Sequence, residues 1–463
     1  MKYQKYLSIL MAGMLLLTPI QSYAFPIIPP VNTPEAMETF LKSYIKENFK
    51  DPVTDQQLNE AKLKGMFDSL DPYSNYYNKE EYKALTETLS GSFVGIGVYF
   101  EPFNDFLKVT KPIAGGPAEK VGIQIGDVII KVDGVDISKV ILEKAINMIK
   151  GEENTIVKIT VLKTGTNKEV TFSIPRGVIK VESVSSKMLP NNVGYVSLSE
   201  FDANSASDVI TAVKKLEAQK MKGLVLDLRD NPGGYLTQAI ELSDFFLPKN
   251  VEIMSIDYKE MQDEVVLDQK VGYDIPLVVL VNKNSASASE IVAAALQKNG
   301  RAKIVGENSY GKGTVQDVIR LPEGDGFKLT VAEYRGPKQM KINGVGVKPD
   351  YDVKESDRSL AEDYKLFVPM SEQKVYNTGT TGLNVYGAQQ RLNFMGSSLK
   401  LTGNMDVPTV NALKAYQKTN KLTASGSLDL STKKSLEEKS IQLYNRIISD
   451  NQLDKAIAVL KAM

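Results

Sequence analysis

The chain has 463 residues, of which 42% are hydrophobic and 24% charged, a composition typical of a soluble globular protein with room for about three domains. Lys plus Arg and Asp plus Glu both total 56, so the formal net charge is zero and nothing favours a nucleic-acid partner. Histidine and cysteine are absent, which excludes a Ser-His-Asp triad, a Cys-His protease and any ordinary zinc site. We expect neither a metal nor a cofactor, and a nucleophilic enzyme of this composition needs Lys, a carboxylate or a terminal amine as its base.

Residues 1–24 have the pattern of a secretory signal peptide. Lys2 and Lys5 precede a short apolar run, and small residues lead up to Ala24. A membrane anchor is the alternative, but the run is short for a bilayer span. We expect export to the cell envelope, on the periplasmic or extracytoplasmic side, with cleavage after Ala24.

Residues 25–87 are predicted to form an N-terminal helical region. Thr33 and Pro34 are a typical helix cap and first helical residue, and a second helix is expected over roughly 54–68. Two helices this short cannot bury both apolar faces by themselves. We therefore expect them to pack on another domain or on a partner chain, as in a homodimer.

Residues 88–177 contain short β-branched runs separated by glycines. The run 128–132 leads into the turn dipeptide Asp133-Gly134, and a helix is expected around 138–149. A hairpin over 155–174, joined at Thr164-Gly165, should follow.

Residues 178–361 alternate apolar strands with helices, which indicates an α/β core. The predicted strands are 193–198, 224–228, 276–281 and 303–305, and the predicted helices are 204–219, 236–246 and 288–298. A linker over 362–382, a helical module over 383–438 and a C-terminal helix over 439–463 are expected to complete the chain.

Three segments carry residues suited to catalysis. The serine-rich run 284–290 joins a buried strand to a helix, where free backbone N–H groups can stabilise an oxyanion. Lys312 lies between two glycines in the run 309–316, which lacks the spacing of a phosphate-binding loop. The run 227–234 ends a strand with two glycines that can aim an N–H into a cleft. Taken singly, these segments also fit a helix cap, a surface lysine and an ordinary turn.

Together the segments resemble the C-terminal processing peptidases, a family of Ser–Lys endopeptidases that carry a PDZ domain. The resemblance covers roughly residues 33–355. Its markers are Leu70-Asp71-Pro72-Tyr73-Ser74, the strand end Asp227–Gly234, Ser285–Glu290, Tyr310–Gln316 and Gly344–Asp350. It implies a multidomain α/β fold: an α/β protease core with an inserted PDZ domain, N-terminal helices and a C-terminal helical module.

The resemblance also implies the catalytic roles. Ser287 would be the nucleophile, Lys312 the general base and Gln316 the residue that orients the lysine, while backbone N–H groups of Gly233 and Ala288 would form the oxyanion hole. A lysine acts as a base near neutral pH only if its pKa falls by roughly three units from about 10.4. Desolvation has that effect, a carboxylate partner opposes it, and a neutral glutamine holds the amine without stabilising its charge.

The segment 88–177 resembles a PDZ domain, and its Gly95-Ile96-Gly97-Val98 would be the loop that binds a peptide carboxylate. The resemblance thus implies a protein or peptide substrate with a free C-terminus, and a PDZ domain that gates the active site. Arg176, at the exit of the domain, is the candidate relay between bound peptide and catalytic residues.

The segment 383–438 resembles a peptidoglycan-binding module, which makes peptidoglycan a possible partner; a helical stability or dimer module is the alternative. The matching residues are Val385, Gln389, Leu392, Gly403, Thr409, Val410, Ala412, Tyr416, Gln417, Leu422, Gly426, Thr432 and Leu436.

Two other functions are compatible with parts of the sequence. One is a catalytically silent scaffold that binds peptides and peptidoglycan. The other is a penicillin-recognising enzyme, whose Ser-x-x-Lys, Ser-Asp-Asn and Lys-Thr-Gly motifs occur at Ser431–Lys434, Ser449–Asn451 and Lys163–Gly165. These three matches fall in different predicted domains and in the wrong order, so the Ser–Lys endopeptidase is favoured.

Overall fold

The computed structural model describes residues 33–463 except 167, 261–262 and 357–358, so the predicted signal peptide lies outside the described residues. The chain divides into two compact units, residues 1–76 and 77–463. No helix within the described ranges is long and apolar enough to cross a membrane.

The first unit contains two helices, α2 (Pro34–Asn48) and α3 (Asp55–Asp68), at the predicted positions. Both begin with a threonine cap: the Thr33 side chain accepts a hydrogen bond from the Ala36 N–H, and Thr54 forms a reciprocal capping box with Gln57. Both helices lie within the described residues, and neither has a buried residue. Apolar side chains of α2 therefore remain exposed in this unit.

The second unit begins with α4 (Lys79–Ser90), followed by the predicted PDZ segment. Its sheet has the strand order β3-β4-β5-β7-β8, with β6 paired to β5, while β2 pairs separately with β9. The elements are β2 (Ser92–Gly95), β3 (Val98–Phe103), β4 (Phe106–Pro112), α5 (Pro117–Lys120), β5 (Val128–Val132), β6 (Val135–Asp136), η1 (Ile137–Lys139), α6 (Leu142–Ile149), β7 (Ile156–Leu162), β8 (Glu169–Pro175) and β9 (Gly177–Lys180).

The predicted strand 128–132 and the predicted hairpin are confirmed as β5 and as β7 with β8. The helix expected around 138–149 is split into η1 and α6, because Val140 between them is extended. The core of this region consists of alternating strand residues that are fully buried, including Val109, Ile129, Ile159 and Ile174.

The α/β core is built on a sheet with the order β10-β11-β12-β15-β16-β20, in which every pair except β10–β11 is parallel. The predicted strands and helices are confirmed to within one or two residues. They are β11 (Val193–Leu198), α7 (Ser205–Ala218), β12 (Gly223–Asp227), α8 (Leu236–Phe246), β15 (Leu277–Val281), α9 (Ala288–Lys298) and β16 (Lys303–Gly306); β10 (Val184–Leu189), η2 (Pro190–Asn192) and β20 (Tyr351–Asp352) were not predicted.

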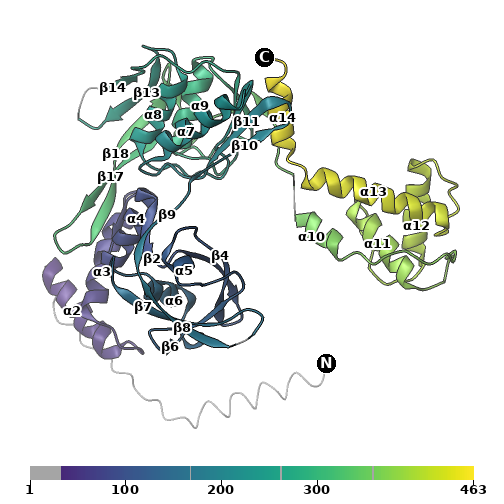
Figure 1. The fold of residues 1–463 in the computed structure, drawn as a ribbon, viewed down its shortest axis with the longest axis horizontal. Coiled ribbons are helices and arrows are strands. Elements are labelled where there is room, and N and C mark those ends of the chain that lie inside the picture. Colours follow the sequence, from purple (N-terminus) through teal and green to yellow (C-terminus); the bar gives the residue numbers. More distant parts are fainter. Residues whose placement is uncertain (1–32, 167, 261–262, 357–358) are drawn as a thin grey trace, which may run out of the picture. The chain divides into compact units, whose positions relative to one another are not determined.

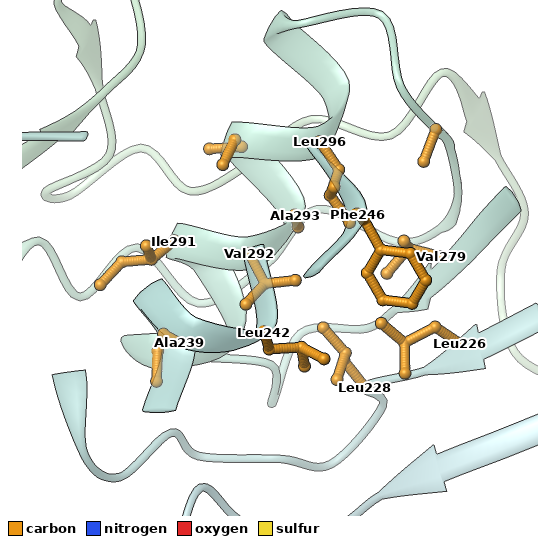
Figure 2. Packing of buried hydrophobic residues seen from close by; sticks show 14 of the residues in the cluster. Leu226, Leu228, Ala239, Leu242, Phe246, Val279, Ile291, Val292, Ala293 and Leu296 are labelled. Carbon is orange, nitrogen blue, oxygen red and sulfur yellow. The ribbon is translucent and has the colours of Figure 1, made fainter. Parts of the chain in front are cut away.

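Both faces of this sheet are covered, which explains why β12 and β15 are continuous apolar runs. On one face, Leu226 and Val279 pack beneath side chains of α8 and α9 such as Leu242 and Val292, as Figure 2 shows. On the other face, Val225 and Leu280 pack against the C-terminal helix α14 (Asn451–Leu460), which lies beside the strands in Figure 1.

A second, antiparallel set of strands flanks the α/β core. The strand β18 pairs with β17, β19 and β13, and β13 pairs with β14. The bounds are β13 (Glu252–Tyr258), β14 (Glu264–Leu267), β17 (Thr314–Arg320), β18 (Gly326–Gly336) and β19 (Met340–Lys341), and the short β1 (Asn75–Tyr77) lies where the two units meet in sequence. A β-bulge between Val315 and Gln316 interrupts the β17–β18 register.

The C-terminal segments differ from the prediction. The helix expected over 439–463 is two helices, since α13 (Leu430–Ile448) ends before Asp450, whose side chain caps α14 by accepting from the Leu453 N–H at 3.0 Å. Val459 and Leu460 of α14 pack on the core sheet.

Part of the predicted linker 362–382 is folded with its neighbours, although most of its residues are exposed. The helix α10 (Ser359–Lys365) runs into it, and Tyr376, which is only 2% exposed, belongs to the core of the helical module. Backbone hydrogen bonds join Tyr376 to Leu428 in both directions. The module itself consists of α11 (Leu383–Phe394), α12 (Val407–Thr419) and the first half of α13.

Candidate active site

Ser287 lies at the turn between β15 and α9, as the residue that immediately precedes the helix. Its backbone has φ 54° and ψ −115°, a conformation that residues other than glycine rarely adopt. Strain of this kind persists only where the surroundings impose it, and it is common at functional sites. The side chain is partly exposed, whereas those of Ser285 and Ser289 are buried.

The two flanking serines are held in structural hydrogen bonds. The Ser285 hydroxyl donates to the Leu228 carbonyl at 2.8 Å and accepts from the Asn282 N–H at 2.9 Å. The Ser289 hydroxyl donates to the Asn231 carbonyl at 3.0 Å. These bonds fix the strand-to-helix turn against the end of β12, so Ser287 is the serine of the run best placed to react.

Glu290 joins the serine turn to the lysine loop. Its fully buried carboxylate accepts hydrogen bonds from the N–H groups of Ser287 (2.9 Å), Gly311 (2.7 Å) and Lys312 (2.8 Å), and from the Ser309 hydroxyl (2.5 Å). Burial raises the pKa of the Glu290 carboxyl, while these four donors favour its ionised form. A single carboxylate therefore sets the separation of the Ser287 and Lys312 backbones.

Tyr334, on β18, makes a second connection between the same two residues. Its hydroxyl oxygen lies 3.0 Å from the Ser287 carbonyl oxygen and 2.5 Å from the Lys312 carbonyl oxygen. The ring is almost completely buried in the main core. Because Ser287 and Lys312 come from different segments, these contacts bring together two of the predicted site residues.

The motif Gly344–Asp350 supports the lysine loop from outside. The Gly344 N–H donates to the Gly311 carbonyl at 2.8 Å, and the Val347 N–H donates to the Ser309 hydroxyl at 2.6 Å. The motif is one of the markers of the family resemblance, and the sequence predicts no role for it. In the structure it holds the loop that carries Lys312.

Gly233 lies directly against the serine turn. Its φ is +106°, and a Cβ atom there would lie 2.7 Å from the Ser287 Cβ and 3.0 Å from the Ala288 nitrogen, so only glycine fits. The Gly233 N–H donates to the Asn231 side-chain oxygen at 2.9 Å. Gly233 and Ala288 are thus adjacent, as expected for an oxyanion hole, with Asn231 bound to one of the two predicted donors.

Gln316 lies on β17 at the β-bulge noted above. Its side-chain nitrogen donates to the Thr314 hydroxyl at 2.7 Å and is 3.4 Å from the Thr330 hydroxyl oxygen. The two threonines therefore fix the orientation of the amide and leave its oxygen as the acceptor that can face an amine. Bulges often re-aim a side chain next to an active site.

Arg229 fixes the strand end that leads to Gly233. Its guanidinium binds both oxygens of Asp227 and both oxygens of Asp450, with contacts of 2.6 Å and 2.7 Å from Nη2. Burial lowers the pKa of Arg229, but the two carboxylates outweigh it and raise that pKa overall. Asp450 belongs to the C-terminal helix, so the last residues of the chain support this strand end.

In the PDZ segment, Gly95 ends β2, Ile96 is buried, Gly97 has a positive φ of 75°, and Val98 begins β3. The Gly97 and Ile96 carbonyls accept from the N–H groups of Ile113 and Ala118, which fixes the loop. The four residues predicted to bind a carboxylate are therefore consecutive at the start of an edge strand.

Arg176 holds the end of the PDZ helix. Its guanidinium donates to the carbonyl oxygens of Ile149 (2.9 Å) and Met148 (2.8 Å), the last two residues of α6, and to the Thr155 hydroxyl (3.0 Å). A cation at a helix C-terminus satisfies carbonyls that lack helical partners. Arg176 thus links α6 to the strand that leaves the domain.

Comparison with known proteins identifies the family. Models of Peptidase family S41, the PDZ domain and a "Putative peptidoglycan binding domain" match residues 192–353, 85–162 and 381–436. The "Carboxy-terminal processing protease CtpA" of Bacillus subtilis is 37% identical over 423 residues, which are 90% of this chain and 88% of that protein. The chain belongs to peptidase family S41. It is a serine-type peptidase, and the predicted family and multidomain α/β fold are confirmed.

Two further proteins are similar to this S41 peptidase. A carboxy-terminal-processing protease of Bartonella bacilliformis is 40% identical over 318 residues, which cover 67% of this chain and 72% of that protein. The solved photosystem II D1 C-terminal processing protease is 28% identical, with a TM-score of 0.40, and the match covers 68% of this chain and 87% of that chain.

In the helical module of the S41 peptidase, two glutamines have equivalent structural roles. Gln389 accepts from the Gly403 N–H and donates to the Thr409 hydroxyl, and Gln417 accepts from the Gly426 N–H and donates to the Thr432 hydroxyl. Each glutamine ties its helix to the following loop and to the start of the next helix. The residues that carried the resemblance are thus mainly structural.

The module also contains a hollow of about 840 Å³ between its three helices. Its lining includes the apolar residues Leu392, Phe394 and Leu443. The cationic residues Lys439 and Arg446 of α13 also line it. Among the residues that the structure describes, no group of three or more Asp, Glu, His or Cys side chains could hold a metal ion.

Sequence reasoning assigned no role to Glu290, Tyr334 or Asn231. Glu290 stands three residues after Ser287, the spacing of a helix capping box, and that signal was available. Tyr334 lies 47 residues from Ser287 and contacts it only through the fold, so no local pattern could reveal it.

Proposed function

We propose that this S41 peptidase is an endopeptidase that cleaves proteins of the cell envelope through an acyl-enzyme, with Ser287 as nucleophile and Lys312 as general base. The observation that carries the proposal is the Glu290 carboxylate, which binds the backbones of both residues. The strained backbone of Ser287 and the structural hydrogen bonds of Ser285 and Ser289 support the choice of serine.

In the proposed reaction, the Lys312 amine takes the proton of the Ser287 hydroxyl as its oxygen attacks the substrate carbonyl carbon. The Gly233 and Ala288 N–H groups stabilise the oxyanion that forms. The C–N bond then breaks, the departing amine takes the proton from Lys312, and an ester to Ser287 remains. Water, deprotonated by Lys312, attacks the ester carbon, the C–O bond to Ser287 breaks, and Ser287 takes the proton back from Lys312. The proposal requires that Asn231 release the Gly233 N–H when substrate binds.

Gln316 is proposed to orient the lysine amine through its side-chain oxygen. The hydrogen bonds from its nitrogen to Thr314 and Thr330 support this orientation. As a neutral group, the amide directs the amine without stabilising a positive charge on it.

The PDZ domain is proposed to bind the free C-terminus of the substrate at Gly95, Ile96, Gly97 and Val98 and to gate catalysis. A peptide would add to the edge strand β3, with its carboxylate at this loop. Arg176, which holds the C-terminal end of α6, is the proposed relay from the bound peptide.

Export with cleavage after Ala24, peptidoglycan binding by the C-terminal module and homodimer formation complete the proposal. The matched peptidoglycan-binding model supports the second, with the hollow beside Lys439 and Arg446 as the candidate surface. Exposed apolar residues of α2, among them Met37, Leu41 and Tyr44, support the third. Sedimentation of the protein with purified cell walls, and its mass in solution, test these two parts.

The catalytic proposal is tested by cleavage of unfolded casein. Ser287→Ala and Lys312→Ala are each expected to abolish turnover while thermal unfolding stays unchanged, and Lys283→Ala, which removes an exposed lysine near the same turn, should leave turnover intact. Retained turnover in the Lys312 variant would contradict the proposal. Peptide binding without any turnover by the wild-type protein would favour the silent scaffold instead.

A further inference from the structure

The far end of the PDZ edge strand carries a small hollow that the carboxylate loop does not include. This hollow, of about 200 Å³, lies where the β3–β4 hairpin meets η1 and the start of α6. Most of its lining residues are apolar, with three polar residues, Asn104, Asp105 and Ser138, beside them; the apolar ones are Pro102, Phe106, Leu107, Ile137, Val140, Leu142 and Ala145. Leu142 is 46% exposed and Ile141 beside it is 72% exposed, so apolar surface at the start of α6 is accessible to a ligand.

The edge strand connects this hollow to the carboxylate loop. Among the strands that the structure describes, β3 has β4 as its only neighbour in the sheet, so its outer edge is available to an extended peptide. The loop lies at the Val98 end of β3, and Pro102 lines the hollow near the other end. At about 3.3 Å per residue, these two positions are about 13 Å apart along the strand.

Pro102 also limits what the backbone of β3 can recognise. Proline has no N–H, so the backbone of residue 102 cannot donate a hydrogen bond to a peptide paired along β3. Beyond Glu101, recognition must therefore depend more on side-chain contacts. The hollow is located where the main-chain ladder loses this donor.

We propose that this hollow binds an apolar side chain of the substrate tail, four or five residues before the terminal residue. The inference rests on the proposed function of the PDZ domain, because it needs the terminal carboxylate at Gly95–Val98. It extends that function: the domain reads a C-terminal carboxylate and an upstream aliphatic residue at a fixed spacing, so an accepted tail has at least five extended residues.

The test uses the full chain with Ser287→Ala, so that peptides bind without being cleaved. Fluorescent eight-residue peptides carry a free C-terminal carboxylate and a single leucine, moved from two to six positions before the terminal residue. Leucine placed four or five residues before the terminal residue is expected to tighten binding about tenfold relative to alanine at the same position. Tenfold corresponds to about 1.4 kcal/mol, which is slightly below the roughly 1.5–3 kcal/mol that burial of a leucine contributes.

Two variants make the test specific. Leu142→Asp places a carboxylate in the hollow, and an acidic residue in the first turn of α6 is compatible with the helix, so the fold should persist while the preference for leucine disappears. Ile156→Lys changes a residue of β7 that is 64% exposed and does not line the hollow, and should retain the preference.

The outcomes separate this inference from the proposed function. If no peptide binds, or if C-terminally amidated peptides bind as well as free acids, the proposed PDZ function fails. If free acids bind but the position of leucine has no effect, or if Leu142→Asp keeps the preference, the upstream site alone is wrong.

Discussion

Two charged side chains near the proposed catalytic residues, the buried Glu290 and the largely buried Arg229, are stabilised in opposite ways. Glu290 is surrounded by neutral donors, three backbone N–H groups and one hydroxyl. Arg229 is paired with two carboxylates, Asp227 and Asp450. At Glu290 the effect of burial prevails and raises the pKa of the carboxyl. At Arg229 burial lowers the pKa, but Asp227 and Asp450 raise it overall.

The two sites differ in what their contacts hold in place. Glu290 connects the backbones of the proposed catalytic residues, and Arg229 connects parts of the fold that are distant in sequence. The donors to Glu290 include the backbones of Ser287 and Lys312, so its loss moves the proposed reacting groups. Arg229 instead ties the end of β12 to α14. We expect loss of Glu290 to impair catalysis as well as stability, and loss of Asp450 to reduce stability with little effect on catalysis.

The largest effect is expected for Glu290→Ala. Four donors would be left without their acceptor in a buried site, and each such loss costs about 1–3 kcal/mol, with incomplete additivity. We expect kcat/KM on a casein-derived peptide to fall at least about 100-fold, because misplacement of reacting groups by about 1 Å has that effect. Glu323→Ala, at an exposed turn, is the matched control.

The next effect concerns stability rather than rate. Asp450→Ala leaves Arg229 with one carboxylate, and we expect the free energy of unfolding to fall by about 2 kcal/mol, within the range for hydrogen bonds to a charged group, because Asp227 still pairs with Arg229. Denaturant unfolding measures this, and kcat should stay within about twofold of wild type. A loss of kcat as large as that of Glu290→Ala would remove the distinction between the two sites.

A smaller effect is expected for Tyr334→Phe, which deletes the hydroxyl between the Ser287 and Lys312 carbonyls. With Glu290 intact, one neutral hydrogen-bonding group contributes about 1 kcal/mol, so we expect roughly a fivefold fall in kcat with the fold retained. Single-turnover cleavage isolates the chemical step. An unchanged rate would mean that Glu290 alone sets the geometry.

The smallest effect is a pH dependence of stability. Because folding raises the Glu290 pKa above its usual 4.5, the contribution of this group is full below that pH and is lost as pH rises through the folded pKa. Wild type should therefore gain stability relative to Glu290→Gln as the pH falls from 7 towards 4.5. Thermal unfolding of both proteins across this range measures the difference, which should not be constant.

Much of this architecture follows from local sequence patterns. The strands and helices of the α/β core were predicted from apolar periodicity, because β12 and β15 are continuous apolar runs with both faces covered. Ser287 and Lys312 were selected as candidates because the motifs that carry the family resemblance are local. The exact ends of these elements follow from caps and turns, which local patterns also describe.

The remainder depended on contacts between distant residues. The split of the C-terminal helix reflects the capping of α14 by Asp450, and that same residue pairs with Arg229, 221 positions away. Tyr376 was assigned to a linker because its partner Leu428 lies in another predicted segment. Such contacts leave no periodic signal near either residue.

The most direct test of the catalytic account is covalent labelling with a fluorophosphonate, followed by mass spectrometry of peptides from the 284–290 turn. The account predicts a single label on Ser287 that disappears in Lys312→Ala and persists in Lys283→Ala. A label on Ser285 or Ser289, or full labelling and turnover without Lys312, would contradict it.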